Sequence, residues 1–285
     1  MSVTEKDYES LVENQWCPGC GNFGILTAVK RALVELQLSP DRVVIASGIG
    51  QGPKLPHYLH VNTFNGLHGR EVPSAEAIKL AADDMTVIVD AGDGGAYAEG
   101  GNHFTHAIRR NIDMTLLVHD NFCYGLTKGQ PSPTTEHGTV TKITPDGVAA
   151  QSLNPLALAI SQGCSFIAQA MSARTDHLVD VLKKAVLHKG FSFVNIYQPC
   201  VTWDRVHTYQ YYKEHCYELG PEYDAKNQMK ALELVLSPSD KHPLGVIYEN
   251  DRPTYESQVL AHVPHPLRDQ PLDPKLAVSL FEEFV

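Results

Sequence analysis

Hydrophobic residues follow two alternating patterns along the first 200 positions of the chain. Short runs rich in β-branched residues are apolar almost throughout, as is typical of strands buried on both faces of a parallel sheet. These runs cover residues 42–48, 85–93, 114–121, 165–170 and 192–199. Apolar residues recur at helical spacing in residues 22–37, 74–83 and 176–189, and Ser74 is placed to cap the second helix. The alternation predicts an α/β fold with a doubly wound, mostly parallel sheet.

The pattern changes after residue 200, where the chain becomes polar and rich in aromatic residues ("TWDRVHTYQYYKEHCYEL"). We expect residues 1–200 to form the α/β domain and residues 201–285 to form a C-terminal extension that serves as a docking surface. Ligands of parallel sheets bind at the carboxyl ends of the strands. The loops that follow the predicted strands are therefore the candidate site.

Composition limits the possible partners and location of the protein. The 285 residues carry a formal net charge of −10, and Lys and Arg are scattered, which argues against nucleic acid as a partner. No apolar run approaches the roughly 20 residues that a membrane span needs. The polar, acidic N-terminus does not resemble a signal peptide. Six cysteines without an export signal indicate a reducing, cytoplasmic environment.

Two polar motifs follow neighbouring predicted strands. "GDGG" begins directly after the strand at 85–91, and 26 residues separate Gly94 from Asn121, which follows the next strand. Asp93 and Asn121 offer the hard oxygen ligands that suit Mg²⁺ when it shares its shell with phosphates. The glycines allow backbone N–H groups to approach the same phosphates. A lone GDG is also common in tight turns, so the spacing to Asn121 carries the prediction.

A second motif, "WCPGCG", places Cys17 and Cys20 three residues apart. Such a pair can bind zinc, exchange a disulfide or ligate an iron–sulfur cluster.

The GDG-x26-N spacing resembles the diphosphate-binding motif of thiamine diphosphate enzymes. "GGNHFTHAIRRNIDMT", "YGLTKGQPSPTT", "KLPHYLH", "GLHGR" and "QPCVTW" together resemble the β subunit of 2-oxoacid:ferredoxin oxidoreductases, from about residue 16 to residue 248. The resemblance implies a sheet of the thiamine diphosphate-binding type. It also implies thiamine-dependent oxidative decarboxylation of a 2-oxoacid, of the 2-oxoglutarate type, to its acyl-CoA, with electrons passed to ferredoxin.

The resemblance also implies roles for individual residues. Magnesium is expected at the side chains of Asp93 and Asn121 and at the backbone carbonyl of Cys123. The cofactor is expected to contact Ile49, Gly50, Gln51, Gly52, His68, Gly92, Gly94, Gly95, Gly125 and Leu126. Lys54 and Lys128 are expected to bind the substrate carboxylate, and His68 to act in catalysis. The family commonly has an acidic residue where this chain has Gly95, so any contribution of that side chain is lost.

The resemblance implies a [4Fe–4S] cluster as well, with one mismatch. Cys17, Cys20 and Cys200 match three of its ligands, but the fourth position holds Gln51, whose neutral amide is a poor ligand for iron. Three outcomes stay open: a cluster with an outside ligand such as water, His57 or His60; a three-iron cluster; or no cluster, with the three thiols as relics or weak zinc ligands. Cys164 and Cys216 are expected to be small buried residues.

The resemblance implies an α subunit that supplies the glutamate against the aminopyrimidine and helps to bind coenzyme A. Two other functions stay open, a cluster-less thiamine-dependent decarboxylase or carboligase and a non-catalytic scaffold. Arg70 is expected to pair with an acidic neighbour or a partner subunit, and His103 and His106 to pack or cap a helix.

Overall fold

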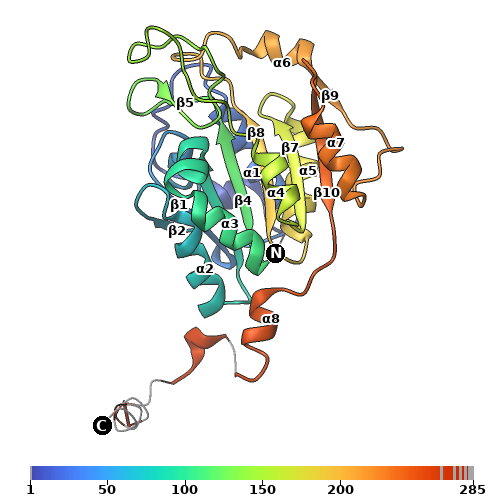
Figure 1. The fold of residues 1–285 in the computed structure, drawn as a ribbon. Coiled ribbons are helices and arrows are strands. Elements are labelled where there is room, and N and C mark those ends of the chain that lie inside the picture. The colour runs from blue at the N-terminus through green and yellow to red at the C-terminus, as the bar shows by residue number, and fades with distance from the viewer. Residues whose placement is uncertain (1, 264–265, 272–273, 276–277, 279–280, 282–285) are drawn as a thin grey trace.

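The computed structural model describes residues 2–263, 266–271, 274–275, 278 and 281 (Figure 1). Its main sheet contains β1 (Val43–Ser47), β2 (Asn62–Asn65), β3 (Thr86–Gly92), β4 (Thr115–Asp120), β7 (Phe166–Met171), β8 (Ser192–Tyr197), β9 (Cys216–Glu218) and β10 (His242–Glu249). A separate hairpin contains β5 (Cys123–Tyr124) and β6 (Gln130–Pro131). The α-helices are α1 (Asn22–Glu35), α2 (Glu71–Ala81), α3 (Gly101–Arg110), α4 (Pro155–Ser161), α5 (Thr175–Leu187), α6 (Tyr209–His215), α7 (Gln228–Leu236) and α8 (Tyr255–Val259).

The strands lie in the order β2-β1-β3-β4-β8-β7-β10-β9. The first six are parallel to one another, while β10 pairs antiparallel with β7. After β1 the chain adds β2 on one side and β3 on the other, so the strand order reverses there. The predicted doubly wound, mostly parallel sheet is confirmed, and its switch point lies where open α/β sheets bind ligands.

Helices cover both faces of the sheet (Figure 1). Helices α2, α3 and α4 pack on one face with Val44 and Ala46 of β1. Helices α1 and α5 pack on the other face with Val43 and Ile45. Because successive side chains of a strand point to opposite faces, a strand enclosed on both sides must be apolar at every position. This requirement explains the unbroken apolar runs in the sequence.

The predicted elements are found with shifted ends. The helix expected at 74–83 begins at Glu71, so Ser74 lies inside it and its hydroxyl donates to the carbonyl of Arg70. Pro73 is tolerated there because the first N–H groups of a helix have no partner within the helix. The helix expected at 22–37 ends at Glu35, and Gln37 adopts a left-handed conformation with φ of 53°. In the described part of the chain, no helix is both long and apolar enough to cross a membrane.

The C-terminal segment contributes more to the sheet than its sequence predicts. Strand β10 pairs with β7, and its Leu244 and Ile247 are fully buried. Residues 201–249 are therefore continuous with the α/β core, although the expected extension reaches beyond the described residues. The role of this segment in docking stays a prediction. Its strands were missed because "HPLGVIYE" is interrupted by Pro and Gly, which weaken a strand pattern.

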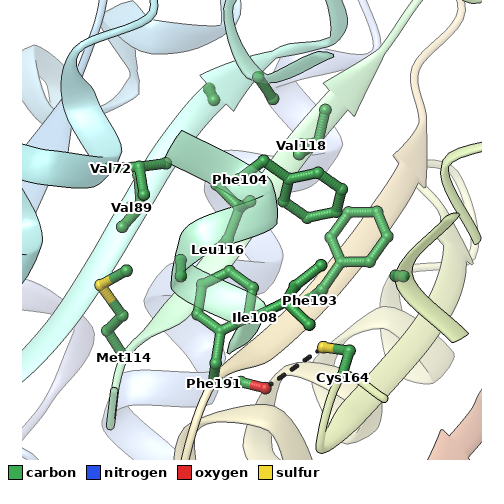
Figure 2. Close-up of a cluster of buried hydrophobic side chains, with 14 of the residues drawn as sticks. Val72, Val89, Phe104, Ile108, Met114, Leu116, Val118, Cys164, Phe191 and Phe193 are labelled. Carbon is green, nitrogen blue, oxygen red and sulfur yellow. Dashed lines mark hydrogen bonds between the residues drawn. The ribbon is translucent and has the colours of Figure 1, made fainter. Parts of the chain in front are cut away.

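The aromatic centre of one face provides a test of the core (Figure 2). Phe104 of α3 is fully buried, and its ring centroid lies 4.9 Å from that of Phe193. Replacing Phe104 by Ala should lower the free energy of unfolding by about 3–5 kcal/mol, since it removes apolar contacts and leaves a cavity. Urea denaturation measures the change. Leu187→Ala, at a position 65% exposed, should cost less than about 0.5 kcal/mol, and equal losses would contradict this account.

Candidate active site

The loops that follow β1, β3 and β4 meet at the carboxyl edge of the sheet around a cavity of about 90 Å³. It is lined by Ile49, Gly50, Gln51, Gly52, Pro53, His68, Gly92, Asp93, Gly94, Gly95, His119, Asn121, Cys123, Tyr124, Gly125, Leu126 and Thr127. Every residue expected to contact the cofactor or magnesium lies on this wall. The fold brings them together because β1, β3 and β4 are adjacent parallel strands.

Asp93 and Asn121 are held in fixed orientations by their neighbours. The Oδ2 of Asp93 accepts hydrogen bonds from the hydroxyls of Ser132 at 2.6 Å and Thr134 at 2.8 Å. The Nδ2 of Asn121 donates to Gln198 at 2.9 Å, which leaves its Oδ1 as the acceptor facing the loop. A carboxylate, an amide oxygen and the nearby carbonyl of Cys123 form a donor set that suits Mg²⁺.

A second acidic residue, Asp120, lies beside Asp93 and was not predicted as part of the site. The hydroxyl of Thr134 lies 2.8 Å from both Asp93 Oδ2 and Asp120 Oδ1. The hydroxyl of Thr134 has one proton and can donate it to only one of the two carboxylates. The other carboxyl group must carry a proton of its own if it is to hydrogen-bond to Thr134. Burial and the proximity of Asp120 raise the pKa of Asp93 above its ordinary value. A bound divalent cation would offset this cost of two buried carboxylates.

Two glycines of the β3 loop allow neighbouring side chains of the site to approach its backbone closely. A Cβ on Gly94 would collide with the ring of Tyr124, and one on Gly95 would lie 2.9 Å from Glu71 Oε1. The buried Nδ1 of His68 and Oε1 of Gln51 have no hydrogen-bond partner among the described residues. The unpartnered polar atoms and the carboxylate and amide oxygens on this wall fit the polar groups of the expected cofactor and its magnesium ion.

His119 forms part of the cavity wall and was also absent from the residues predicted for the site. Its Nε2 lies 2.8 Å from Asp90 Oδ1, and its Nδ1 lies 2.8 Å from Asn22 Oδ1. Asp90 and His119 are almost completely buried, and they pair across β3 and β4. Asp90 lies within an otherwise apolar strand. This single acid, at a position where parallel strands are normally hydrophobic, was the sequence signal that could have indicated the buried pair.

The three cysteines expected to bind iron line a neighbouring cavity of about 70 Å³ together with Gln51. Cys17 is exposed, whereas Cys20 and Cys200 are half-buried. Among the described residues, however, no three His, Cys, Asp or Glu side chains are placed to hold a metal ion. Neither His57 nor His60, considered as outside ligands, lines this cavity. The arrangement therefore does not fit a four-thiolate cluster.

The thiol of Cys123 has an unexpected neighbour, since only its backbone carbonyl was assigned a role. The Cys123 thiol donates to Asn121 Oδ1 at 3.7 Å, and its sulfur also lies against that of Cys200. The hydrogen bond between the two sulfurs lowers the pKa of Cys200 to about 6 and raises the pKa of Cys123 above its ordinary value. The segment after β4 that contains Asn121 and Cys123 is therefore in direct contact with the cysteine cavity.

The two lysines expected to bind substrate lie outside the cofactor cavity. Lys54 is half-buried in the 3₁₀-helix η3 (Gly52–Tyr58) and does not line the cavity. Lys128 is exposed, has a left-handed backbone with φ of 83°, and lines an adjacent cavity of about 330 Å³. That cavity shares Cys123 with the cofactor cavity and also contains Lys142 and Arg205. The roles of both lysines stay predictions.

Other expected residues have structural positions. The guanidinium of Arg70 donates to the backbone carbonyls of Glu99 at 2.7 Å and Gly69 at 3.0 Å, so these hydrogen bonds go to main-chain oxygens and not to the expected acidic side chain. His103 and His106 lie in α3 as expected. Cys164 is fully buried, and its thiol donates to the carbonyl of Phe191 (Figure 2).

Two family models match the chain. Residues 43–196 match the thiamine pyrophosphate enzyme, C-terminal TPP binding domain. Residues 200–262 match the C-terminal part of the pyruvate ferredoxin oxidoreductase beta subunit.

Curated relatives and one solved structure cover nearly the whole chain. The 2-oxoacid:ferredoxin oxidoreductase subunit beta of Saccharolobus solfataricus is 41% identical over 272 residues, which are 90% of this chain and 89% of the relative. The 2-oxoglutarate synthase subunit KorB of Archaeoglobus fulgidus is 40% identical over 72% of this chain and 78% of its own. The structure of 2-oxoglutarate:ferredoxin oxidoreductase from Magnetococcus marinus, with 2-oxoglutarate, coenzyme A and succinyl-CoA bound, matches with a TM-score of 0.90. It is 34% identical, with 98% of this chain and 96% of that one covered. With this breadth of similarity and the geometry of the cavity, the chain belongs to the β subunits of the 2-oxoacid:ferredoxin oxidoreductases.

Proposed function

We propose that this chain binds thiamine diphosphate and Mg²⁺ and acts with an α subunit in the cytoplasm. The complex would oxidatively decarboxylate 2-oxoacids, with 2-oxoglutarate preferred, coenzyme A as the acyl acceptor and ferredoxin as the electron acceptor. The observation that carries the proposal is the cavity in which Asp93, Asn121 and the glycine-rich β3 loop lie together. The names of relatives from several organisms support the choice of 2-oxoglutarate.

Each group on the cavity wall has a binding task in this proposal. Asp93, Asn121 and the carbonyl of Cys123 would hold the magnesium ion, and the backbone of Gly94 and Gly125 would face the diphosphate. When bound, thiamine diphosphate would supply a nucleophilic carbon for the 2-oxo group and an electron-accepting ring for the decarboxylation. The protein's contribution is to orient the cofactor and to exclude water from it.

Exposed apolar side chains at the rim of the site support a partner subunit. Exposed apolar side chains surround the entrance to the cofactor cavity and its neighbours, namely Leu126 at 40%, Val201 at 45%, Trp203 at 44% and Val206 at 58% exposure. Apolar side chains at the rim of a cleft are typical of surfaces that another protein covers. We infer that the α subunit packs here and closes the cofactor cavity.

A second function is favoured by one specific observation. Gln51 stands where a cluster ligand is expected, and the cysteine cavity lacks a metal-binding arrangement in the described residues. A thiamine-dependent decarboxylase or carboligase without an iron–sulfur cluster would need neither a cluster ligand at position 51 nor a metal-binding arrangement in the cysteine cavity.

The proposed function predicts dye reduction that depends on substrate. The chain co-expressed with its α partner should reduce a viologen dye when 2-oxoglutarate and coenzyme A are added. Asp93→Asn should abolish the reaction, because it removes the only carboxylate of the expected magnesium ligands. Ser132→Ala removes one hydrogen bond to Asp93 and should lower the rate of dye reduction by about 10–100-fold.

Other outcomes of this assay would each support a different function. Consumption of the 2-oxoacid without dye reduction would favour the decarboxylase. Failure to bind thiamine diphosphate and Mg²⁺, even with the partner present, would favour the non-catalytic scaffold.

Magnesium affinity should depend on pH. The raised pKa of Asp93 means that a proton competes with Mg²⁺ for the carboxylate, so binding should weaken between about pH 8 and pH 6, by up to about tenfold per unit. Calorimetry in the presence of thiamine diphosphate measures this. Asp120→Asn removes the neighbouring charge, so the pH range in which the magnesium affinity falls should move to lower pH. An affinity that is constant over this range would contradict the assigned ligand.

Iron content should depend on residue 51. Gln51→Cys, purified without oxygen, should contain about four iron and four sulfide per αβ unit, because it completes a four-thiolate set. The unaltered chain should contain fewer. Cys164→Ser, at a core position outside the cysteine cavity, should leave the iron content of the Gln51→Cys protein unchanged. About four iron atoms in the unaltered chain would show that another group replaces the missing thiolate.

A further inference from the structure

The cavity of about 330 Å³ beside the cofactor cavity has no assigned ligand. Its wall comes from loop segments between residues 122 and 142 and between residues 202 and 207, and it shares Cys123 with the cofactor cavity. The volume lies within the range of pockets that bind small molecules. The Lys and Arg residues on this wall are Lys128, Lys142 and Arg205, so we call it the basic cavity.

The cations of the basic cavity are unpaired. Among the described residues, none forms an ion pair or a hydrogen bond with the side chains of Lys128, Lys142 or Arg205. The chain as a whole carries a formal net charge of −10, so acidic residues are plentiful elsewhere. Unpaired positive charges that line one cavity repel each other and favour an anionic ligand.

The acidic residues of the same wall pair with a histidine instead. The Nδ1 of His207 lies 2.6 Å from Asp204 Oδ2, and its Nε2 lies 3.3 Å from Glu136 Oε1. Burial by itself would lower the pKa of His207, but the hydrogen bond with Asp204 and the charges of both acids raise it above its ordinary value. Asp204 also accepts hydrogen bonds from the backbone N–H groups of residues 206 and 207. Neither carboxylate therefore pairs with the cations.

The backbone that carries Lys128 is strained. Lys128 has a φ of 83°, a left-handed conformation that side chains rarely adopt. The next residue, Gly129, has a φ of 90°, and a Cβ there would lie 3.0 Å from the ring of Trp203. The corner is thus packed against Trp203 and keeps Lys128 on the cavity wall. Strain of this kind is frequent where a loop holds a ligand.

We propose that the basic cavity binds the phosphate groups of a nucleotide, either the nucleotide part of coenzyme A or a free nucleotide. Lysine and arginine bind phosphate through charge-assisted hydrogen bonds. The hydroxyls of Thr139 and Thr202 lie on the same wall and can donate to phosphate oxygens. Trp203, which is 44% exposed, offers an aromatic surface on which a base can stack.

Coenzyme A fits the position of the basic cavity. Its thiol lies at the end of a long arm, far from its phosphates, so a phosphate site outside the cofactor cavity leaves the thiol free to reach inward past Cys123. Trp203 and Val206 lie on the rim where we infer that the α subunit packs, which would enclose the ligand. This part of the inference rests on the proposed function, and it gives this chain a share of the coenzyme A site.

The KM for coenzyme A tests the proposal in the αβ complex, with 2-oxoglutarate and a viologen dye at saturation. Lys142→Ala and Arg205→Ala should each raise this KM by about tenfold, the effect of one lost charge-assisted hydrogen bond. The kcat and the KM for 2-oxoglutarate should change by less than about twofold. Lys142→Arg keeps the charge and should stay within about threefold of the unaltered complex. Lys230→Ala removes an exposed lysine of α7 outside the cavity and should change none of these constants.

Two ligands identify the group that is recognised. Pantetheine has the thiol but no phosphate, so Lys142→Ala and Arg205→Ala should use it as the unaltered complex does. Calorimetry with adenosine 3′,5′-bisphosphate measures binding without turnover, and each variant should lose about tenfold in affinity. A loss of affinity for ADP in calorimetry, with an unchanged KM for coenzyme A, would identify a free nucleotide as the ligand.

Other results would overturn the proposal. Unchanged constants for coenzyme A, adenosine 3′,5′-bisphosphate and ADP would show that the cations bind no nucleotide. An equal rise in the KM for pantetheine would show that the phosphates are not recognised. An effect confined to the KM for ferredoxin would assign the cations to the docking of an acidic protein. If the unaltered complex reduces no dye, the proposed function is wrong, whereas calorimetry still tests the basic cavity.

Discussion

The site depends on two buried carboxyl groups at the ends of adjacent strands. Asp93 follows β3 and Asp120 ends β4, and the hydroxyl of Thr134 lies 2.8 Å from both. Two carboxylates so close together in a buried place repel each other, and without a cation one of them must retain its proton. The surrounding loops supply hydroxyl and amide donors that fix both groups. The arrangement is costly for the isolated chain, and the proposed divalent cation would offset that cost.

A second layer of charge lies beneath the same cavity. Asp90 pairs with His119 across β3 and β4, and Glu71 approaches from α2. Each of these side chains occupies a position where a parallel sheet or its covering helix would ordinarily bury an apolar group. The interior below the site is thus unusually polar, and buried charged groups of this kind cost stability.

The relation between the two cavities bears on the chemistry of the protein. Gln51 and Asn121 line both the cofactor cavity and the cysteine cavity, and the thiols of Cys123 and Cys200 meet at their boundary. Any centre held by the cysteines would therefore lie next to the thiamine site. The amide of Gln51 lies at this boundary, at the position where the resemblance implies a cluster cysteine.

Local sequence patterns were sufficient to predict the sheet and most of its strands, whereas most residues of the cofactor cavity were named from the resemblance to a family. Strands enclosed on both faces must be apolar throughout, and GDG-x26-N can be recognised because both motifs directly follow such strands. The other features of the fold and the site are determined by contacts between elements that are distant in the sequence. Asp120, His119 and Glu71 carry no local signal, since their buried positions beside the site arise only where β3, β4 and α2 meet. The sheet position of β10 and the placement of Lys54 and Lys128 outside the cofactor cavity likewise depend on packing, which no local pattern encodes.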